Sequence, residues 1–277
     1  MKSKHLLHGL LAASLFLSLT ACSSTPASAP ITDKKVETKE EPKKEEAHAK
    51  PHWSYKGETG PDKWASLDPA SSKCTNGTEQ SPIDIELTKV KLDKTLEDIK
   101  INYNPTAFTV MNNGHTIQAN DASGANSIVV EGKEYKLAQM HFHKPSENEI
   151  NGQAFEMEGH LVHKSSDGNL AVLAFLIKAG QENKELAEIW SKLPKEETKE
   201  DIKLDKQVDL VNLLPKEKKS FRYNGSLTTP PCSEQVKWVV LEQPIELSKE
   251  QIAAFGEIFP DNHRSVQPVN NRQVSEK

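Results

Sequence analysis

The stretch that decides the fold is Tyr135-Lys136-Leu137-Ala138-Gln139-Met140-His141-Phe142-His143. Apolar and polar residues alternate along it, which is the period-two pattern of a strand with one buried face. His141 and His143 stand two residues apart, so a strand places both imidazoles on one face, together with Gln139. The stretch therefore predicts a strand that carries two histidines and a glutamine side by side.

Short segments with the same alternation recur along the chain, separated by Gly, Asn and Pro. They cover residues 100–103, 108–111, 116–119, 127–130, 156–162, 170–177 and 235–241. Only residues 183–192 and 249–258 have the apolar spacing of a helix. Because strands and helices do not alternate, we predict a mainly β (α+β) fold with a mostly antiparallel sheet and a few short helices.

The composition is that of an ordinary soluble protein. The chain has 277 residues, and its 35 Lys and Arg against 40 Asp and Glu give a formal net charge of −5. Charged residues make up 27% of the chain and hydrophobic residues 35%. This balance excludes a multi-pass membrane protein, a fibrous protein and a strongly basic nucleic-acid-binding protein, so we expect no nucleic acid partner.

The N-terminus has the pattern of an export signal. Lys2 and Lys4 precede an apolar stretch over residues 6–19, which is too short for a permanent membrane span. Leu19-Thr20-Ala21-Cys22 follows, and it resembles the bacterial lipoprotein box. That resemblance implies cleavage after residue 21 and a diacylated Cys22. A plain signal peptide cut near Ala27 or Ala29 is the alternative.

The next segment lacks the residues needed for a core. Residues 31–50 hold six acidic and six basic residues among twenty, with almost nothing apolar. We interpret residues 1–21 as the lipoprotein signal peptide, 22–50 as a disordered charged tether and 51–277 as the folded domain. A lipid on Cys22 would anchor this exported domain to a membrane of the bacterial cell envelope, on its periplasmic or outer face.

Three cysteines leave one thiol unpaired in an exported protein. Lipidation would consume Cys22, which leaves Cys74 and Cys232 to form a disulfide. Two separate buried thiols are the alternative.

Four of the ten histidines fall between residues 141 and 163. The segment Glu158-Gly159-His160-Leu161-Val162-His163 predicts a second strand. On it, Glu158, His160 and Val162 share one face, and His163 points the other way. We interpret His163 as a structural, hydrogen-bonded histidine.

The two strands together supply the ligands of a catalytic zinc. His141, His143 and His160 would offer three imidazole nitrogens and leave a fourth position open for water. A His-x-His pair alone is weak evidence for a metal. Gln139 and Glu158 strengthen it, because each precedes a histidine by two residues on the same face and can accept a hydrogen bond from its second ring nitrogen.

These segments resemble the α-class carbonic anhydrases in order and spacing, from about Trp53 to Arg272. Further matching segments are His52-Trp53-Ser54-Tyr55, Asn112-Asn113-Gly114-His115 and Gly225-Ser226-Leu227-Thr228-Thr229-Pro230-Pro231. The resemblance implies a large, twisted, mostly antiparallel sheet with the active site in a cone at its middle. It also implies reversible hydration of carbon dioxide to bicarbonate and a proton.

The resemblance implies roles for individual positions. The Zn²⁺ ligands are His141, His143 and His160, and the zinc-bound hydroxide attacks carbon dioxide. Thr228 and Glu147 orient that hydroxide.

Further roles implied by the resemblance concern the proton and the substrate. His115 corresponds to the position that shuttles the proton out. The substrate-binding positions are Val162, Val172, Leu227, Thr229 and Trp238. Cys74 and Cys232 match a cysteine pair seen in bacterial members.

Two other functions compete with this one. A zinc hydrolase or esterase of the amidohydrolase kind also begins with His-x-His, but it requires a barrel of alternating strands and helices. A surface-binding lipoprotein with a metal-stabilised sheet is the second alternative. Zinc content and a hydration assay distinguish these functions.

Overall fold

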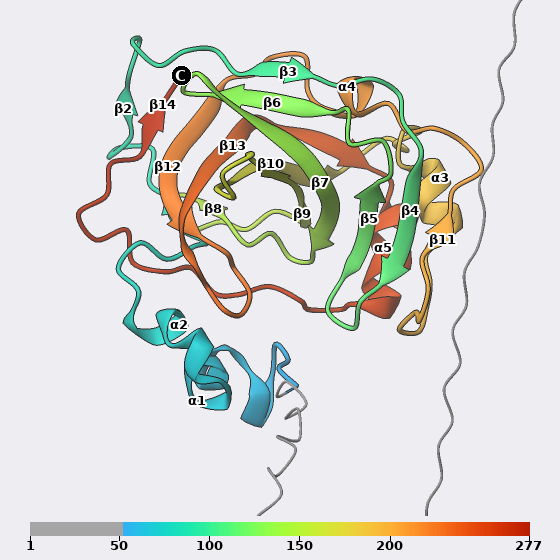
Figure 1. Cartoon of the computed structure of the whole chain (residues 1–277), viewed down its shortest axis with the longest axis horizontal. Coiled ribbons are helices and arrows are strands. Elements are labelled where there is room, and N and C mark those ends of the chain that lie inside the picture. Colours follow the sequence, from blue (N-terminus) through green and yellow to red (C-terminus); the bar gives the residue numbers. More distant parts are fainter. Residues whose placement is uncertain (1–51) are drawn as a thin grey trace, which may run out of the picture. The chain divides into compact units, whose positions relative to one another are not determined.

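A computed structural model describes residues 52–277 of the chain (Figure 1). The predicted signal peptide over 1–21, the tether over 22–50 and Cys22 lie outside these residues. In the described part, no helix combines the length and the apolar character that crossing a membrane would require.

Strands dominate the described residues. The central sheet has twelve strands: β2 (Lys91–Leu92), β3 (Lys100–Asn102), β4 (Phe108–Asn112), β5 (Ile117–Asp121), β6 (Ser127–Val130), β7 (Lys133–His143), β9 (Met157–Lys164), β10 (Leu170–Ala179), β11 (Ile202–Lys203), β12 (Ser220–Ser226), β13 (Glu234–Leu247) and β14 (Ser275–Glu276). β1 (Asp84–Ile85) and β8 (Glu149–Ile150) form a separate parallel pair.

The strand order of the central sheet is β11-β4-β5-β7-β9-β10-β13-β12-β14-β2, with β6 beside β7 and β3 beside β6. Two of its pairs are parallel, β10 with β13 and β14 with β2, and the others are antiparallel. Figure 1 shows that the sheet is curved, with β7, β9 and β10 in its middle. The prediction of a mainly β fold with a mostly antiparallel sheet is confirmed, and the alternating barrel of the hydrolase alternative is absent from residues 52–277.

β10 lies in the middle of the sheet because its sequence is apolar on both faces. Val172, Ala174 and Leu176 pack into one buried cluster, and the alternate residues Leu173 and Phe175 pack into another on the opposite face. The second of these clusters also takes in side chains of the helices α3 and α5. The helices α3 and α5 therefore cover the face of the sheet that carries Leu173 and Phe175.

The helices are short and few. They are α1 (Trp64–Leu67), α2 (Lys73–Asn76), α3 (Ala187–Ser191), α4 (Leu210–Leu213) and α5 (Lys249–Ile258), with 3₁₀ turns at Gly57–Thr59, Pro61–Lys63 and Pro69–Ser71. α5 has the predicted bounds, because Ser248 and Gln251 form a reciprocal capping box at its start. α3 begins later than the predicted 183, because the Asn183 side chain accepts from the Leu186 N–H and turns the chain there.

β7 changes face midway along its length. Its register with β9 pairs Leu137 with His163 but Gln139 with Val162, so β7 contains one extra residue at this point. A β-bulge of this kind reverses which side the following residues face. Leu137 and Met140 consequently join the same core cluster. An unbroken alternation would have placed Leu137 on the face that carries the histidines.

Candidate metal centre

The pairing of β7 with β9 brings the three predicted ligands together. His141 lies directly opposite His160 in the antiparallel register, and His143 lies opposite Glu158. One ring nitrogen from each of His141, His143 and His160 lies within 4.8 Å of the others. Among the described residues, no carboxylate or thiolate joins this cluster.

The outer nitrogen of each ring faces an oxygen acceptor. His141 Nδ1 is 2.8 Å from Gln139 Oε1, and His160 Nε2 is 2.9 Å from Glu158 Oε1. These two partners are the ones that the sequence predicts. His143 Nδ1 is 2.8 Å from the main-chain oxygen of Asn262, which the sequence analysis does not predict.

These contacts fix the tautomer of each imidazole. An acceptor at the outer nitrogen requires the proton there, so the inner nitrogen presents a lone pair. His160 Nδ1 and His141 Nε2 are 3.3 Å apart, and in this tautomer neither has a proton to donate to the other. His143 Nε2 is buried without a hydrogen-bond partner in residues 52–277. Three converging lone pairs of imidazole nitrogen fit Zn²⁺ with an open fourth position.

Burial keeps the three rings uncharged, which a metal ligand requires. It lowers the pKa of His143 to about 4, with a smaller opposing effect from the hydrogen bond to Asn262. The pKa values of His141 and His160 are also lowered well below the usual value, chiefly by burial and then by the neighbouring histidines.

Glu158 is fully buried and bonded through both carboxylate oxygens. Oε1 accepts from His160 Nε2 and, at 2.7 Å, from Asn148 Nδ2. Oε2 accepts from the main-chain N–H groups of Glu147 and Asn148 at 2.8 and 2.7 Å. The carboxylate that holds His160 is therefore itself held by three further donors.

Glu147 and Thr228 lie buried beside the cluster. Glu147 Oε2 is 3.4 Å from His143 Nε2, and Glu147 Oε1 accepts from the Arg264 N–H at 2.8 Å. Burial raises the pKa of Glu147 to about 8, and the Thr228 hydroxyl and the Arg264 N–H oppose this shift. Glu147 Oε2 has no hydrogen bond of regular geometry in the described residues.

The predicted substrate positions border the cluster on its apolar side. Val172 and Trp238 are buried there, and Val162 and Leu227 pack against the same group of side chains. The rings of His160 and Trp238 meet edge to face, with centroids 5.0 Å apart. Thr229 is half-buried in the following loop.

His115 lies on the turn between β4 and β5 and is half-buried. The Asn113 side chain shapes this turn by accepting from the N–H groups of His115 and Thr116, each at 2.9 Å. A cavity of about 470 Å³ borders His115 and is lined also by His52 and Pro230. The three-histidine cluster does not line this cavity.

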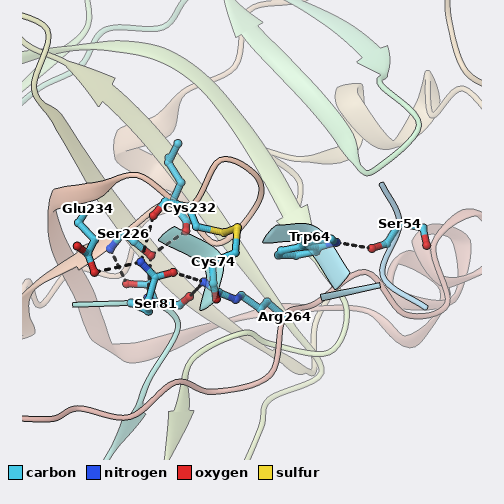
Figure 2. Close-up of a disulfide and its surroundings, with 10 residues drawn as sticks. Ser54, Trp64, Cys74, Ser81, Ser226, Cys232, Glu234 and Arg264 are labelled. Atoms are coloured by element: carbon cyan, nitrogen blue, oxygen red, sulfur yellow. Dashed lines mark hydrogen bonds between the residues drawn. A yellow bond between two sulfur atoms is a disulfide. The ribbon is translucent and has the colours of Figure 1, made fainter. Parts of the chain in front are cut away.

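A disulfide joins Cys74 of α2 to Cys232 (Figure 2). Cys232 follows the loop that carries Thr228 and Thr229, and its N–H donates to the Thr229 oxygen at 2.9 Å. Disulfides persist in oxidising compartments outside the cytosol, so this bridge indicates export. The alternative of two free thiols is wrong.

Arg264 connects the disulfide region with the histidine cluster. Its Nη2 donates to the Cys74 oxygen and its Nη1 to the Ser81 oxygen, both at 2.9 Å (Figure 2). Its main-chain N–H donates to Glu147, as described above. Arg264 and Asn262 are not predictable from local sequence, because their contacts are with residues more than a hundred positions away.

The comparisons with known proteins agree with this geometry. The family model described as "Eukaryotic-type carbonic anhydrase" matches residues 59–277. A carbonic anhydrase of Klebsiella pneumoniae is 44% identical over 227 residues, which cover 81% of this chain and 91% of that protein.

Two solved structures extend the similarity to the fold. The α-carbonic anhydrase of Thermovibrio ammonificans, in complex with the inhibitor sulfanilamide, is 42% identical with a TM-score of 0.78 and covers 81% of this chain and 99% of its own. A hyperthermostable carbonic anhydrase from a hydrothermal vent chimney is 46% identical with a TM-score of 0.77, with the same coverage of both chains. The chain belongs to the eukaryotic-type, or α-class, carbonic anhydrase family, and its activity is the reversible hydration of carbon dioxide.

Proposed function

We propose that His141, His143 and His160 hold the catalytic Zn²⁺. The observation that supports this most strongly is the set of three inner lone pairs, each fixed by an acceptor on the opposite side of the ring. When bound, zinc supplies the Lewis acidity that makes a water nucleophilic near neutral pH, an effect for which carbonic anhydrase is itself the reference example.

Thr228 and Glu147 orient the reacting water. The Thr228 hydroxyl would accept a hydrogen bond from that water and direct its own proton towards the Glu147 carboxylate, whose Oε2 has no hydrogen-bond partner in residues 52–277. Burial raises the pKa of Glu147 to about 8, and the positive charge of a bound Zn²⁺ would oppose that shift and keep the carboxylate ionised. Glu147 stays in place because Oε1 is bonded to the Arg264 N–H. This arrangement leaves the oxygen lone pair of the water free for the substrate.

The substrate is held by apolar contacts. Carbon dioxide carries no charge and forms only weak hydrogen bonds, so it can bind to an apolar wall. Val162, Val172, Leu227 and Trp238 form such a wall, and they offer no polar group that would hold water there instead. Thr229 follows Thr228 in the chain and is half-buried, and we assign it to the bicarbonate product, which its hydroxyl can bond.

His115 carries the released proton to buffer. Burial lowers its pKa, the neighbouring His52 acts in the same direction, and Glu197 opposes both. The ring is therefore neutral at neutral pH and able to accept a proton. The cavity beside it gives a small buffer base room to take that proton away.

The metal assignment is tested by zinc analysis of His160→Ala. We expect zinc to fall from one equivalent per chain to a small fraction, and carbon dioxide hydration to fall with it. His163→Gln is the matched control, because His163 lies on the same strand but bonds Tyr103 in the core. Full zinc in both variants would overturn the assignment.

We also propose that the catalytic domain, residues 51–277, is tethered by residues 22–50 to a lipid on Cys22 in the bacterial cell envelope, after removal of the signal peptide over 1–21. The support is the sequence before Cys22, together with the disulfide, which indicates export. In cells, Cys22→Ser should move the protein from the detergent-extracted membrane fraction to the soluble exported fraction. An unchanged distribution would contradict the anchor but not the enzymatic assignment.

A further inference from the structure

Asn262 follows α5 and is only 1% exposed, with every polar group bonded. Its Nδ2 donates to the main-chain oxygens of His115 and Phe142, both at 3.0 Å. Its Oδ1 accepts from the Lys144 N–H at 2.8 Å, and its main-chain oxygen accepts from His143 Nδ1. One side chain therefore joins the His115 turn to the end of β7.

These bonds reinforce a contact between two segments that also meet through Thr116, whose hydroxyl donates to the Phe142 oxygen at 2.6 Å. His115 belongs to the turn between β4 and β5, whereas His143 ends β7. Asn262 reaches both from a position 147 and 119 residues further along the chain. Because a buried amide or carbonyl is costly to leave unpaired, the four bonds restrict where the two histidines can lie.

We propose that Asn262 is a positioning residue that fixes the shuttle histidine His115 relative to the metal ligand His143. This inference rests on the proposed shuttle role of His115. Proton transfer depends steeply on the distance and alignment of donor and acceptor, so a small displacement of the His115 turn slows it. The main-chain bond from Asn262 to His143 stays intact whatever side chain the residue carries.

The imidazole of His115 is held separately, because it stacks on the indole of Trp53. Asn262 thus fixes the backbone of His115, while Trp53 contacts its ring. Loss of the Asn262 amide should consequently shift the ring on the indole rather than release it.

Asn262→Asp is the most conservative test. It keeps the size and the acceptor for the Lys144 N–H, but it turns an oxygen towards the main-chain oxygens of His115 and Phe142. In the zinc-loaded enzyme we expect kcat in dilute buffer to fall roughly tenfold, with kcat/KM for carbon dioxide nearly unchanged and kcat restored by added imidazole. A parallel fall of kcat and kcat/KM, insensitive to imidazole, would overturn the proposal.

Asn126→Asp is the matched control. Asn126 is also fully buried, and its amide bonds Asp121 and the Asn104 N–H rather than any residue of the site. The Asn126→Asp variant should be less stable than the wild type, but its kcat should not become dependent on buffer concentration. Asn262→Ser, which is uncharged and too short to span both oxygens, provides a second variant and should show the same loss in dilute buffer as Asn262→Asp.

A second readout does not depend on activity. Stacking on Trp53 moves the ring-proton resonances of His115 upfield in the NMR spectrum. These resonances should move in Asn262→Asp and stay in place in Asn126→Asp, and unchanged resonances in both would overturn the proposal. His115→Ala separates the positioning role of Asn262 from the shuttle role of His115. If His115→Ala loses activity in dilute buffer and the Asn262 variants do not, only the positioning role is contradicted. If His115→Ala loses no activity, the shuttle role itself is contradicted.

Discussion

Trp53 and His115 lie face to face, with ring centroids 3.6 Å apart and planes inclined by 7°. Trp53 is held in turn by edge contacts with Tyr55 and Trp64. The aromatic opening of the domain therefore supports the ring of the proposed proton shuttle, and it does so beside the cavity that borders His115.

Replacing His115 by alanine should slow turnover mainly in dilute buffer. The proton would then have to leave without a side chain that accepts it from the site and releases it to buffer, and such a group contributes at least about a hundredfold to proton transfer. Stopped-flow hydration at several imidazole concentrations measures the effect. A loss that does not respond to imidazole would contradict the shuttle role.

Glu158→Gln should weaken zinc binding by about 10- to 100-fold. Each oxygen of Glu158 accepts from two donors, so an amide NH₂ at either position faces donors that it cannot satisfy. Competition with a chelator at constant pH measures the affinity.

Glu156→Gln is the control for that experiment, because Glu156 is exposed and lies two residues before Glu158. Both variants remove one carboxylate and keep the chain length. Equal zinc affinity in the two would show that Glu158 does not hold His160.

His163 should make the protein lose stability as the pH falls. Burial lowers its pKa from 6.5 to about 3, while the unfolded chain keeps the ordinary value. Between these values the unfolded state binds a proton that the native state excludes, so the free energy of unfolding decreases with falling pH. The contribution of neutral His163 to the free energy of unfolding is complete above pH 6.5 and is lost progressively as the pH falls towards 3.

His163→Gln should reduce that slope by up to about 1.4 kcal/mol per pH unit between about pH 4 and 6. Glutamine does not titrate and can still bond the Tyr103 hydroxyl, which lies 2.7 Å from His163 Nε2. Urea unfolding of zinc-loaded wild type and variant across this range provides the measurement. Identical slopes would mean that His163 is protonated in the folded protein.

Gly159→Ala should destabilise the protein by about 1–3 kcal/mol, because it overpacks a closed core. A Cβ at Gly159 would overlap the Phe175 ring at Cζ. Phe175→Leu should recover part of the loss when the two changes are combined, since the residues share one space. Urea denaturation of both single variants and the double variant tests this, and additive losses would contradict direct contact.

The ligand strands were predictable because their chemistry lies in local patterns. His141 and His143 share a strand face with Gln139, and His160 shares one with Glu158, so spacing alone identifies each histidine and its acceptor. The β7 bulge was not predicted, although the apolar positions change from 135 and 137 to 140 and 142 at this point.

Other features depend on tertiary contacts that no local pattern encodes. β12 was not predicted, because Arg222 is buried in mid-strand and removes the alternation. Its charge is accommodated by a hydrogen bond from Nη1 to the distant Glu97 oxygen. Asn262 acts on His143 through a main-chain oxygen, and such an atom is the same in every residue type.

The register that pairs His141 with His160 has a consequence for refolding. Since side chains alternate across a sheet, a slip of one position would send His160 into the core and bring His163 to the opposite side. His163 would lie too far along β7 to replace His160, because the native register pairs it with Leu137 and not with His141. Mispaired molecules would therefore present two converging imidazoles instead of three. In a refolded preparation, correctly paired molecules should therefore keep Zn²⁺ after dialysis, whereas compact molecules with the slipped register should lose it.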